Sequence, residues 1–197
     1  MGTEIKTWQI IGGRLQLINT DLKEGGRTEP YDLEPWIASN PEIIGDDVVI
    51  IGRQIETDSG RIDLLGMDQL GNLVIVELKR DKLQREALAQ AIDYASNVAE
   101  WTRDKLGKIC NEHTGKSLQE LFEERFSDIE FGNISVNSRQ RIVLAGFSLE
   151  SALERMIEWL TDKYNVNINA VVLKYVKTAS GDELLAKTSI ISEESEQ

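Results

Sequence analysis

Asp63, Glu77 and Lys79 stand out in this sequence because their residue types and spacing suit chemistry at a bound cation. Glu77 and Lys79 are two residues apart in an extended segment, so their side chains share one face of a β-strand. A divalent cation held by carboxylates activates a water molecule, and a nearby ammonium holds that water and offsets charge on a phosphate. The three residues therefore predict a metal-activated water directed at a phosphodiester.

The turn between the two segments predicts that Asp63 and Glu77 meet. A three-residue loop, Gln-Leu-Gly, whose Gly71 is free to adopt a positive φ, is a favoured closure for a β-hairpin. This loop sets Asp68 opposite Asn72, and counting back along both strands sets Asp63 opposite Glu77, about 5 Å apart at Cβ. Two opposed carboxylates repel each other unless a cation compensates. Oxygen ligands without a nearby Cys or His pair favour Mg²⁺ or Mn²⁺ over zinc.

An alternative interpretation is a surface hairpin whose exposed face carries Asp, Glu and Lys as solvated charges. Glu77 argues against it, because this glutamate lies in the otherwise apolar run Leu73–Leu78, which is typical of a central strand. A charge buried in such a strand is expensive unless it has a function. The apolar flanks therefore favour the functional interpretation.

The same residues resemble a known family pattern. The arrangement Asp63-x13-Glu77-x-Lys79 resembles the PD-(D/E)xK nuclease superfamily, and the closer similarity is to the catalytic domain of NucS/EndoMS-type endonucleases. This similarity covers the segments LEPWIASNPEIIG, IGRQIETDSGRIDLLGMDQLGNLVIVELKR and QAIDY. Gln90 and Tyr94 are four residues apart on the expected helix after the second strand, so they point the same way and resemble a further active-site motif of the family. By that resemblance they would support the site or contact DNA.

The resemblance also implies which residues bind the metal and which residue positions the water. Asp63 and Glu77, together with the backbone carbonyl of Leu78, would ligate Mg²⁺ or Mn²⁺, and Lys79 would position the attacking water.

The family places one more glutamate on the first core helix, close to the metal. Glu34 is the candidate, because it can lie off the apolar face of Leu33 and Ile37. Glu29 and Glu42 are rivals, and Glu34 could simply be a first-turn acid favoured by the helix dipole. Which glutamate completes the site stays open at this level.

Basic residues near these positions in sequence are candidates for contacts with DNA phosphates, and Arg61 and Arg80 are the best placed. The full set is Arg53, Arg61, Arg80, Lys82 and Arg85. The net charge of −12 counts against nonspecific binding to nucleic acid but leaves room for a local basic groove.

We therefore expect a DNA endonuclease acting in repair or defence, with single-stranded, branched or mismatched DNA as candidate substrates, and the residues leave RNA open. A homodimer is plausible, because one centre cuts one strand. The alternative function is a catalytically silent nuclease fold that binds nucleic acid or a protein partner.

Alternating strand and helix patterns predict one α/β domain with a restriction-endonuclease-like core, in which helices flank a mixed central sheet. We expect an N-terminal β-hairpin and linker over residues 1–28, the nuclease domain over 29–191, and a disordered acidic tail over 192–197. Only about thirty residues precede the nuclease core, so we expect a stand-alone relative without the separate N-terminal domain of full-length family members.

The expected elements begin with a short helix over 32–39, capped by Asp32, and strands over 46–55, 61–68 and 72–80. A single long helix over 83–106 and a second over 115–126 follow, then a strand at 141–147, a helix at 150–164 and strands at 166–176 and 183–191. No apolar run approaches the roughly 20 residues that span a bilayer. The one cysteine, Cys110, forms no internal disulfide, so a cytoplasmic location without a membrane partner is expected.

Overall fold

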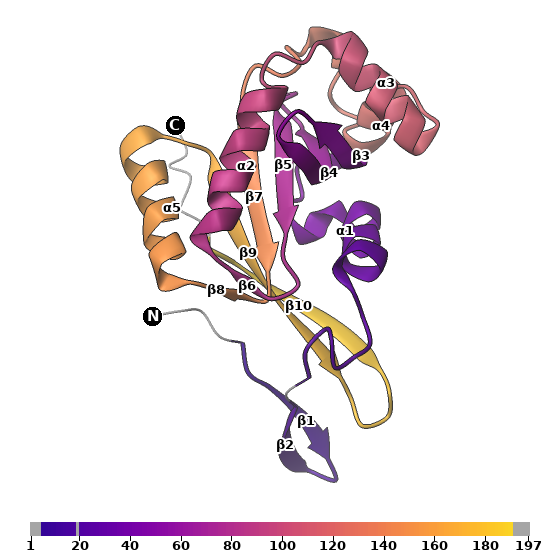
Figure 1. Cartoon of the computed structure of the whole chain (residues 1–197). Helices are drawn as coiled ribbons and strands as arrows, with labels where there is room; N and C mark the ends of the chain where they lie inside the picture. The colour runs from indigo at the N-terminus through magenta and orange to yellow at the C-terminus, as the bar shows by residue number, and fades with distance from the viewer. Residues whose placement is uncertain (1–4, 19, 191–197) are drawn as a thin grey trace.

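A computed structural model describes residues 5–18 and 20–190, and its centre is a six-stranded mixed β-sheet (Figure 1). The strands follow the order β10-β9-β7-β5-β4-β3. β5, β7 and β9 run parallel, whereas β3, β4 and β10 pair antiparallel with their neighbours. Their bounds are Val48–Thr57 for β3, Gly60–Asp68 for β4, Leu73–Leu78 for β5, Gln140–Gly146 for β7, Ile168–Lys177 for β9 and Glu183–Ile190 for β10. The predicted α/β class with a mixed central sheet is confirmed.

Strands β5, β7 and β9 carry apolar side chains on both faces of the sheet, and both faces must be shielded from water. Helices therefore cover both faces. α1, Glu34–Ser39, packs on one face. α2, Arg85–Val98, and α5, Ser151–Tyr164, cover the opposite face (Figure 1). α3, Arg103–Thr114, and α4, Leu118–Arg125, pack against β3. In the described part of the chain, no helix is long and apolar enough to cross a membrane.

The N-terminal hairpin is a separate two-stranded sheet that projects from the body (Figure 1). β1, Thr7–Ile11, and β2, Arg14–Ile18, join through two glycines whose φ angles of 55° and 78° suit a tight turn. The segment that follows is more than a spacer, because Leu22 is buried in the main core. The acidic tail predicted over residues 192–197 lies outside the described residues.

The hairpin of β4 and β5 has the register that its turn predicts. Leu64 pairs with Val76, so continuation of the same register sets Asp63 opposite Glu77. The predicted register is confirmed for the four pairs from Met67–Leu73 to Leu64–Val76, and Asp63 and Glu77 lie one residue beyond them.

Asp68 and Gly71 fix the turn itself. The buried Asp68 carboxylate accepts hydrogen bonds from the backbone N–H groups of Leu70 and Asn72, at 3.0 and 2.9 Å. Gly71 has a φ of 84°, and a β-carbon there would lie 2.9 Å from the Ser135 carbonyl oxygen. Only glycine satisfies both the backbone angle and the close approach.

The long helix predicted over 83–106 is wrong, because the chain leaves the helix after Val98 and resumes as α3. Asn137 explains the break. Its side-chain amide donates to the carbonyls of Val98, Ala99 and Trp101, at 2.9, 3.2 and 2.9 Å. These bonds replace helical partners at the C-terminus of α2.

Two predicted helix starts are also wrong. Asp32 lies inside a short π-helical turn, Glu29–Leu33, where its carboxylate accepts hydrogen bonds from Thr28, so it does not cap α1. Lys82–Leu83 forms the short strand β6, which pairs in parallel with β8, Ser148–Leu149, and delays α2 by two residues.

Substitution of Asn137 tests the account of this break. Asn137→Ala removes the three hydrogen bonds and places an ordinary side chain at a φ of 62°. We expect the free energy of unfolding to fall by about 2–3 kcal/mol. Asn137→Gly loses the same bonds but tolerates the φ, so its loss should be smaller by about 1 kcal/mol. Urea unfolding measures both, and an unchanged stability in both variants would contradict the capping role.

Candidate active site

Asp63 lies where β4 and β5 separate. The ladder between these strands stops at Leu64, the neighbour of Asp63. β5 stays paired with β7 along its whole length. Beyond the end of the ladder, the backbone N–H of Leu78 donates to Asp63 Oδ2 at 2.8 Å. A side-chain carboxylate thus takes the place of a strand partner, and Asp63 is fixed against the β5 backbone.

Glu77 is a buried carboxylate on the face of β5 that α2 and α5 cover. Its side chain is 1% exposed, and its register partner in β7 is the core residue Leu144. Lys79 Nζ donates to Glu77 Oε1, whereas Glu77 Oε2 has no hydrogen-bond partner among the described residues. The Lys79 side chain is 35% exposed, so its ammonium can face both the carboxylate and solvent.

Glu34 of α1 and Gln54 of β3 form a second group of contacts, which includes Asp63. Glu34 begins α1 and is 1% exposed. Gln54 Nε2 donates to Glu34 Oε1 at 2.8 Å and to Asp63 Oδ1 at 3.4 Å. Arg53 Nε lies 3.6 Å from Glu34 Oε2. The structure therefore connects the predicted helix glutamate to Asp63 through one amide. We refer to Glu34, Asp63 and Glu77 as the carboxylate cluster.

Gln54 is not among the predicted site residues, although the sequence contains a signal for it. The two-residue turn after Thr57 pairs that residue with Gly60, and counting back in step sets Gln54 opposite Asp63. A β-bulge near Ile51 does not disturb that count, because it lies before the counted segment. The same reasoning that placed Glu77 opposite Asp63 would have found Gln54.

The two rival glutamates differ in their positions. Glu29 lies close to the cluster, because its carboxylate accepts from the Arg80 backbone N–H at 2.6 Å and its charge raises the pKa of Glu77 after the larger effects of burial and Asp63. Glu42 is exposed in the turn Pro41–Ile43, where its carbonyl accepts from Lys187.

Burial and repulsion raise the pKa values of the carboxylate cluster. Burial raises the pKa of Glu34 to about 7, and burial together with the Asp63 charge raises the pKa of Glu77 to about 7. Burial also raises the pKa of Asp63. For Lys79, burial lowers the pKa, but the hydrogen bond to Glu77 and the nearby carboxylates outweigh it, so the pKa is raised overall. The Lys79 ammonium therefore stays protonated.

The donor set fits a hard divalent cation. Glu34 Oε2 and Glu77 Oε2 are buried and lack hydrogen-bond partners among the described residues. A buried carboxylate oxygen without a hydrogen bond is costly, and a bound cation would satisfy it. Within residues 5–18 and 20–190, no three Asp, Glu, His or Cys side chains form a complete ligand group. Mg²⁺ and Mn²⁺ do not need three protein ligands of this kind, because such ions keep several waters beside one or two carboxylates.

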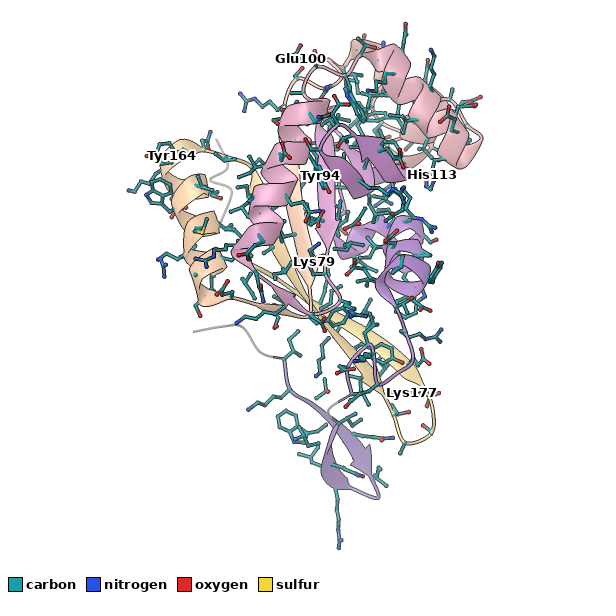
Figure 2. The ribbon with its side chains drawn as sticks, in the orientation of Figure 1. Lys79, Tyr94, Glu100, His113, Tyr164 and Lys177 are labelled. Atoms are coloured by element: carbon teal, nitrogen blue, oxygen red, sulfur yellow. The ribbon has the colours of Figure 1, made fainter. Side chains whose placement is uncertain are left out.

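Gln90 and Tyr94 lie together on α2, as their spacing predicts. Gln90 Nε2 donates to the Tyr94 hydroxyl at 2.7 Å. Tyr94 is 3% exposed and packs against the face of the sheet that carries Glu77, and Figure 2 shows it on the helix in front of the sheet, with Lys79 following β5. A β-carbon at Gly60 would lie 2.9 Å from the Tyr94 hydroxyl, so this hydroxyl abuts the start of β4.

The five candidate DNA-binding cations are not gathered into one patch by their side-chain contacts. Arg53 contacts Glu34, whereas three others form exposed ion pairs with acids close to them in sequence. These pairs are Arg61 with Glu56 at 2.6 Å, and Arg80 with Asp81 and Arg85 with Glu86, both at 3.4 Å. Lys82 is exposed in β6. Exposed ion pairs contribute little free energy, so these pairs would not prevent the cations from binding phosphates.

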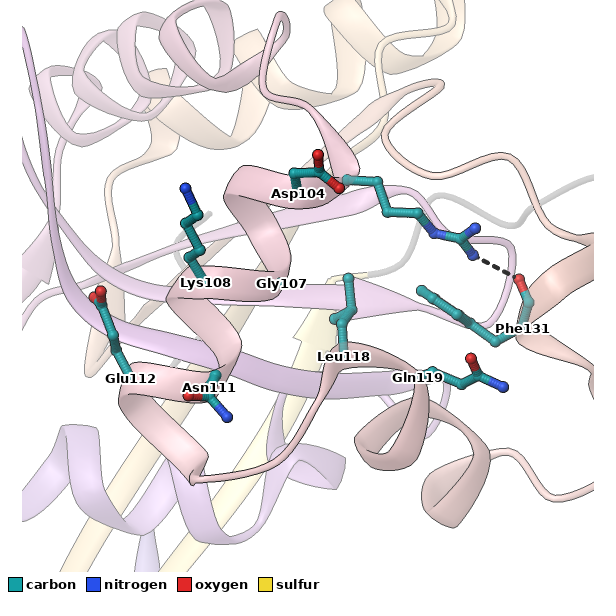
Figure 3. A pocket seen from close by; sticks show the side chains of 9 residues that line it. Asp104, Gly107, Lys108, Asn111, Glu112, Leu118, Gln119 and Phe131 are labelled. Carbon is teal, nitrogen blue, oxygen red and sulfur yellow. Dashed lines mark hydrogen bonds between the residues drawn. The ribbon is translucent and has the colours of Figure 1, made fainter.

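A cavity of about 680 Å³ between α3 and α4 is a separate feature (Figure 3). Arg103 lines it and donates to the Phe131 carbonyl at 2.9 Å. None of its lining residues belongs to the carboxylate cluster.

Comparison with known families gives a match over residues 29–141 to the family described as Endonuclease NucS C-terminal domain. Two relatives are both named Endonuclease NucS. That of Aeropyrum pernix is 28% identical over 116 residues, which cover 58% of this chain and 43% of the relative. That of Sulfolobus acidocaldarius is 30% identical over 100 residues, which cover 51% of this chain and 39% of the relative. The chain therefore matches less than half the length of these relatives.

Two solved structures show partial overlap. A repair endonuclease from Pyrococcus abyssi gives a TM-score of 0.39 at 20% identity, covering 70% of this chain and 44% of that one. An EndoMS–dsDNA complex gives a TM-score of 0.42 at 22% identity, covering 72% and 48%. The resemblance to the NucS/EndoMS catalytic domain is confirmed by the family match.

The raised pKa values predict that the metal-free protein loses stability as pH rises. Between the ordinary value of 4.5 and about 7, Glu34 and Glu77 bind protons more tightly in the native state, so the free energy of unfolding falls with rising pH. Glu77→Gln removes one contribution and should reduce the fall between about pH 5 and pH 8 by roughly 1–3 kcal/mol. Urea unfolding in EDTA measures this, and a steeper fall in the variant than in the parent would contradict it.

Proposed function

The chain belongs to the family of Endonuclease NucS C-terminal domains, and on that premise we propose that it is a Mg²⁺- or Mn²⁺-dependent endonuclease that hydrolyses DNA phosphodiester bonds. The observation that carries the proposal is the carboxylate pair of half-buried Asp63 and buried Glu77, which lie just beyond the end of the β4–β5 ladder, with the Lys79 ammonium bonded to Glu77. Burial of the Glu77 carboxylate close to a second carboxylate is costly, and use at a cation accounts for it.

Each residue has a role that follows from its contacts. Asp63, Glu77 and the Leu78 carbonyl would hold the cation, which when bound supplies an activated water and polarises the phosphate. The Leu78 N–H orients the Asp63 carboxylate, because it occupies one oxygen and fixes the plane of the group. Lys79 stays protonated, so it acts as a hydrogen-bond donor to the water and the phosphate rather than as a base.

The substrate is proposed to be DNA in a single-stranded, branched or mismatched form. Because the net charge is −12, binding depends on local cations, of which Arg53 and Arg80 lie next to acidic residues of the site region. A homodimer would place two centres on the two strands of a duplex. The alternative, a silent fold that only binds, does not account for the buried Glu34 and Glu77 oxygens that lack hydrogen-bond partners among the described residues.

Glu77→Gln and Lys79→Ala test the centre. The first keeps the shape but loses the charge that binds a cation, and the second loses the ammonium. We expect each to lower the cleavage rate by about 10²–10³-fold or more while the protein stays folded. The measurement is a cleavage panel of single-stranded, branched, mismatched and duplex DNA, and RNA, with Mg²⁺ and with Mn²⁺.

Glu124→Gln and Lys116→Ala are matched controls, because these residues form an exposed Glu–Lys pair at α4. Both control variants should cut like the parent. If Glu77→Gln also cuts every substrate at the parent's rate, the assignment is wrong. If the parent binds no Mn²⁺ and cuts nothing, the silent fold is the better account.

Tyr94→Phe tests the supporting motif. The change removes the hydroxyl that accepts from Gln90 and keeps the ring in the core. We expect kcat to fall about 10-fold with little change in melting temperature, as for other groups that orient a metal centre. Tyr164→Phe, at the exposed end of α5, is the control and should leave kcat unchanged. A melting temperature that falls while kcat stays constant would assign the hydroxyl to the fold alone.

A further inference from the structure

Gln54 contacts the carboxylates of buried Glu34 and half-buried Asp63 from a backbone conformation that glutamine rarely adopts. We propose that Gln54 is a positioning residue: its side-chain amide sets the Glu34 and Asp63 carboxylates in the geometry that receives the cation. This inference rests on the proposed function, because it concerns the same centre.

The first support is the pair of hydrogen bonds. One Nε2 amide donates at 2.8 Å to Glu34 Oε1 and at 3.4 Å to Asp63 Oδ1. Asp63 Oδ2 is already fixed at 2.8 Å by the Leu78 N–H, so Asp63 is held from both sides. Each carboxylate oxygen has two lone pairs, so these bonds leave lone pairs free for a cation.

The second support is the backbone. Gln54 has a φ of 54° within β3, between residues that pair regularly with β4. This left-handed region favours glycine, and longer side chains enter it only where surrounding structure holds them there. Glycine would suit the backbone better, so the chain retains glutamine for its side chain.

The third support is the chemistry of the amide. A neutral donor reduces repulsion between Glu34 and Asp63 without adding a positive charge that would compete with a cation. Arg53, the next residue, lies 3.6 Å from Glu34 Oε2 and is 36% exposed, so a cationic side chain is available here but sits at the solvent side. The bridging position between the two carboxylates is occupied by the uncharged amide of half-buried Gln54.

Two variants separate positioning from folding. Gln54→Met keeps the length of the side chain but removes the donor, and Gln54→Gly removes the donor while relieving the backbone. We expect both to bind Mn²⁺ about 10–100-fold more weakly in calorimetry, as when other groups that orient metal ligands are lost. On the best DNA substrate, kcat at limiting Mn²⁺ should fall while KM for DNA stays unchanged. Gln119→Met, which changes a glutamine on α4, should match the parent.

The outcomes distinguish this inference from the proposed function. Weaker Mn²⁺ binding by Gln54→Gly, with a melting temperature at least equal to that of the parent, supports positioning even if Gln54→Met unfolds. Parental Mn²⁺ affinity in Gln54→Gly overturns it, because the role would then be structural. If the parent binds Mn²⁺ but cuts no nucleic acid, the proposed function fails, and the calorimetry still decides the role of Gln54. A parent that binds no Mn²⁺ overturns both.

Discussion

Two carboxylates, Asp63 and Glu77, lie one residue beyond the last pair of the β4–β5 ladder, and their mutual repulsion is the constraint on which the proposed site depends. Burial together with the Asp63 charge raises the pKa of Glu77 to about 7. Three donors act on the pair: the Leu78 N–H, the Gln54 amide and the Lys79 ammonium. Each donor occupies one oxygen and leaves other lone pairs open, so the repulsion is reduced while lone pairs remain for the proposed divalent cation.

The position of β5 makes this arrangement rigid. Its residues pair in parallel with β7 up to Leu78 and Ala145, and the Lys79 N–H then donates to the Ala145 carbonyl at 2.9 Å. On the other edge of β5, the pairing with β4 stops at Leu64, so Asp63 is unpaired with β5 in the ladder. One edge of the strand is therefore fixed by the core, while the other is free to present a backbone N–H and side chains to the site. A site on such a strand holds its geometry better than one on a loop.

The parts of the site defined by one hairpin could be predicted from the sequence, and the parts defined by packing could not. The Asp63–Glu77 register follows from a short loop, and Gln54 was within reach of the same reasoning. The break after α2 depends on Asn137, which lies 39 residues from the Val98 carbonyl that it caps, and no periodicity marks such a contact. Likewise, only the fold shows that Glu34 is joined to Asp63 by the Gln54 amide.

The residues with positive φ show where the chain accepts backbone strain and for what purpose. Among the described residues, three that are not glycine have positive φ: Gln54, Asn137 and Asn165. Asn165 ends α5 and Asn137 caps α2, and asparagine tolerates this conformation because its short side chain bonds to nearby backbone groups. Neither explanation applies to Gln54, because it is not an asparagine and it lies within β3 instead of at the end of a helix. Its strain is on the order of 1–3 kcal/mol, and the hydrogen bonds that its amide donates in the described structure go to Glu34 and Asp63. The strain is therefore located at the site, where it holds two carboxylates in place, rather than in the framework of the fold.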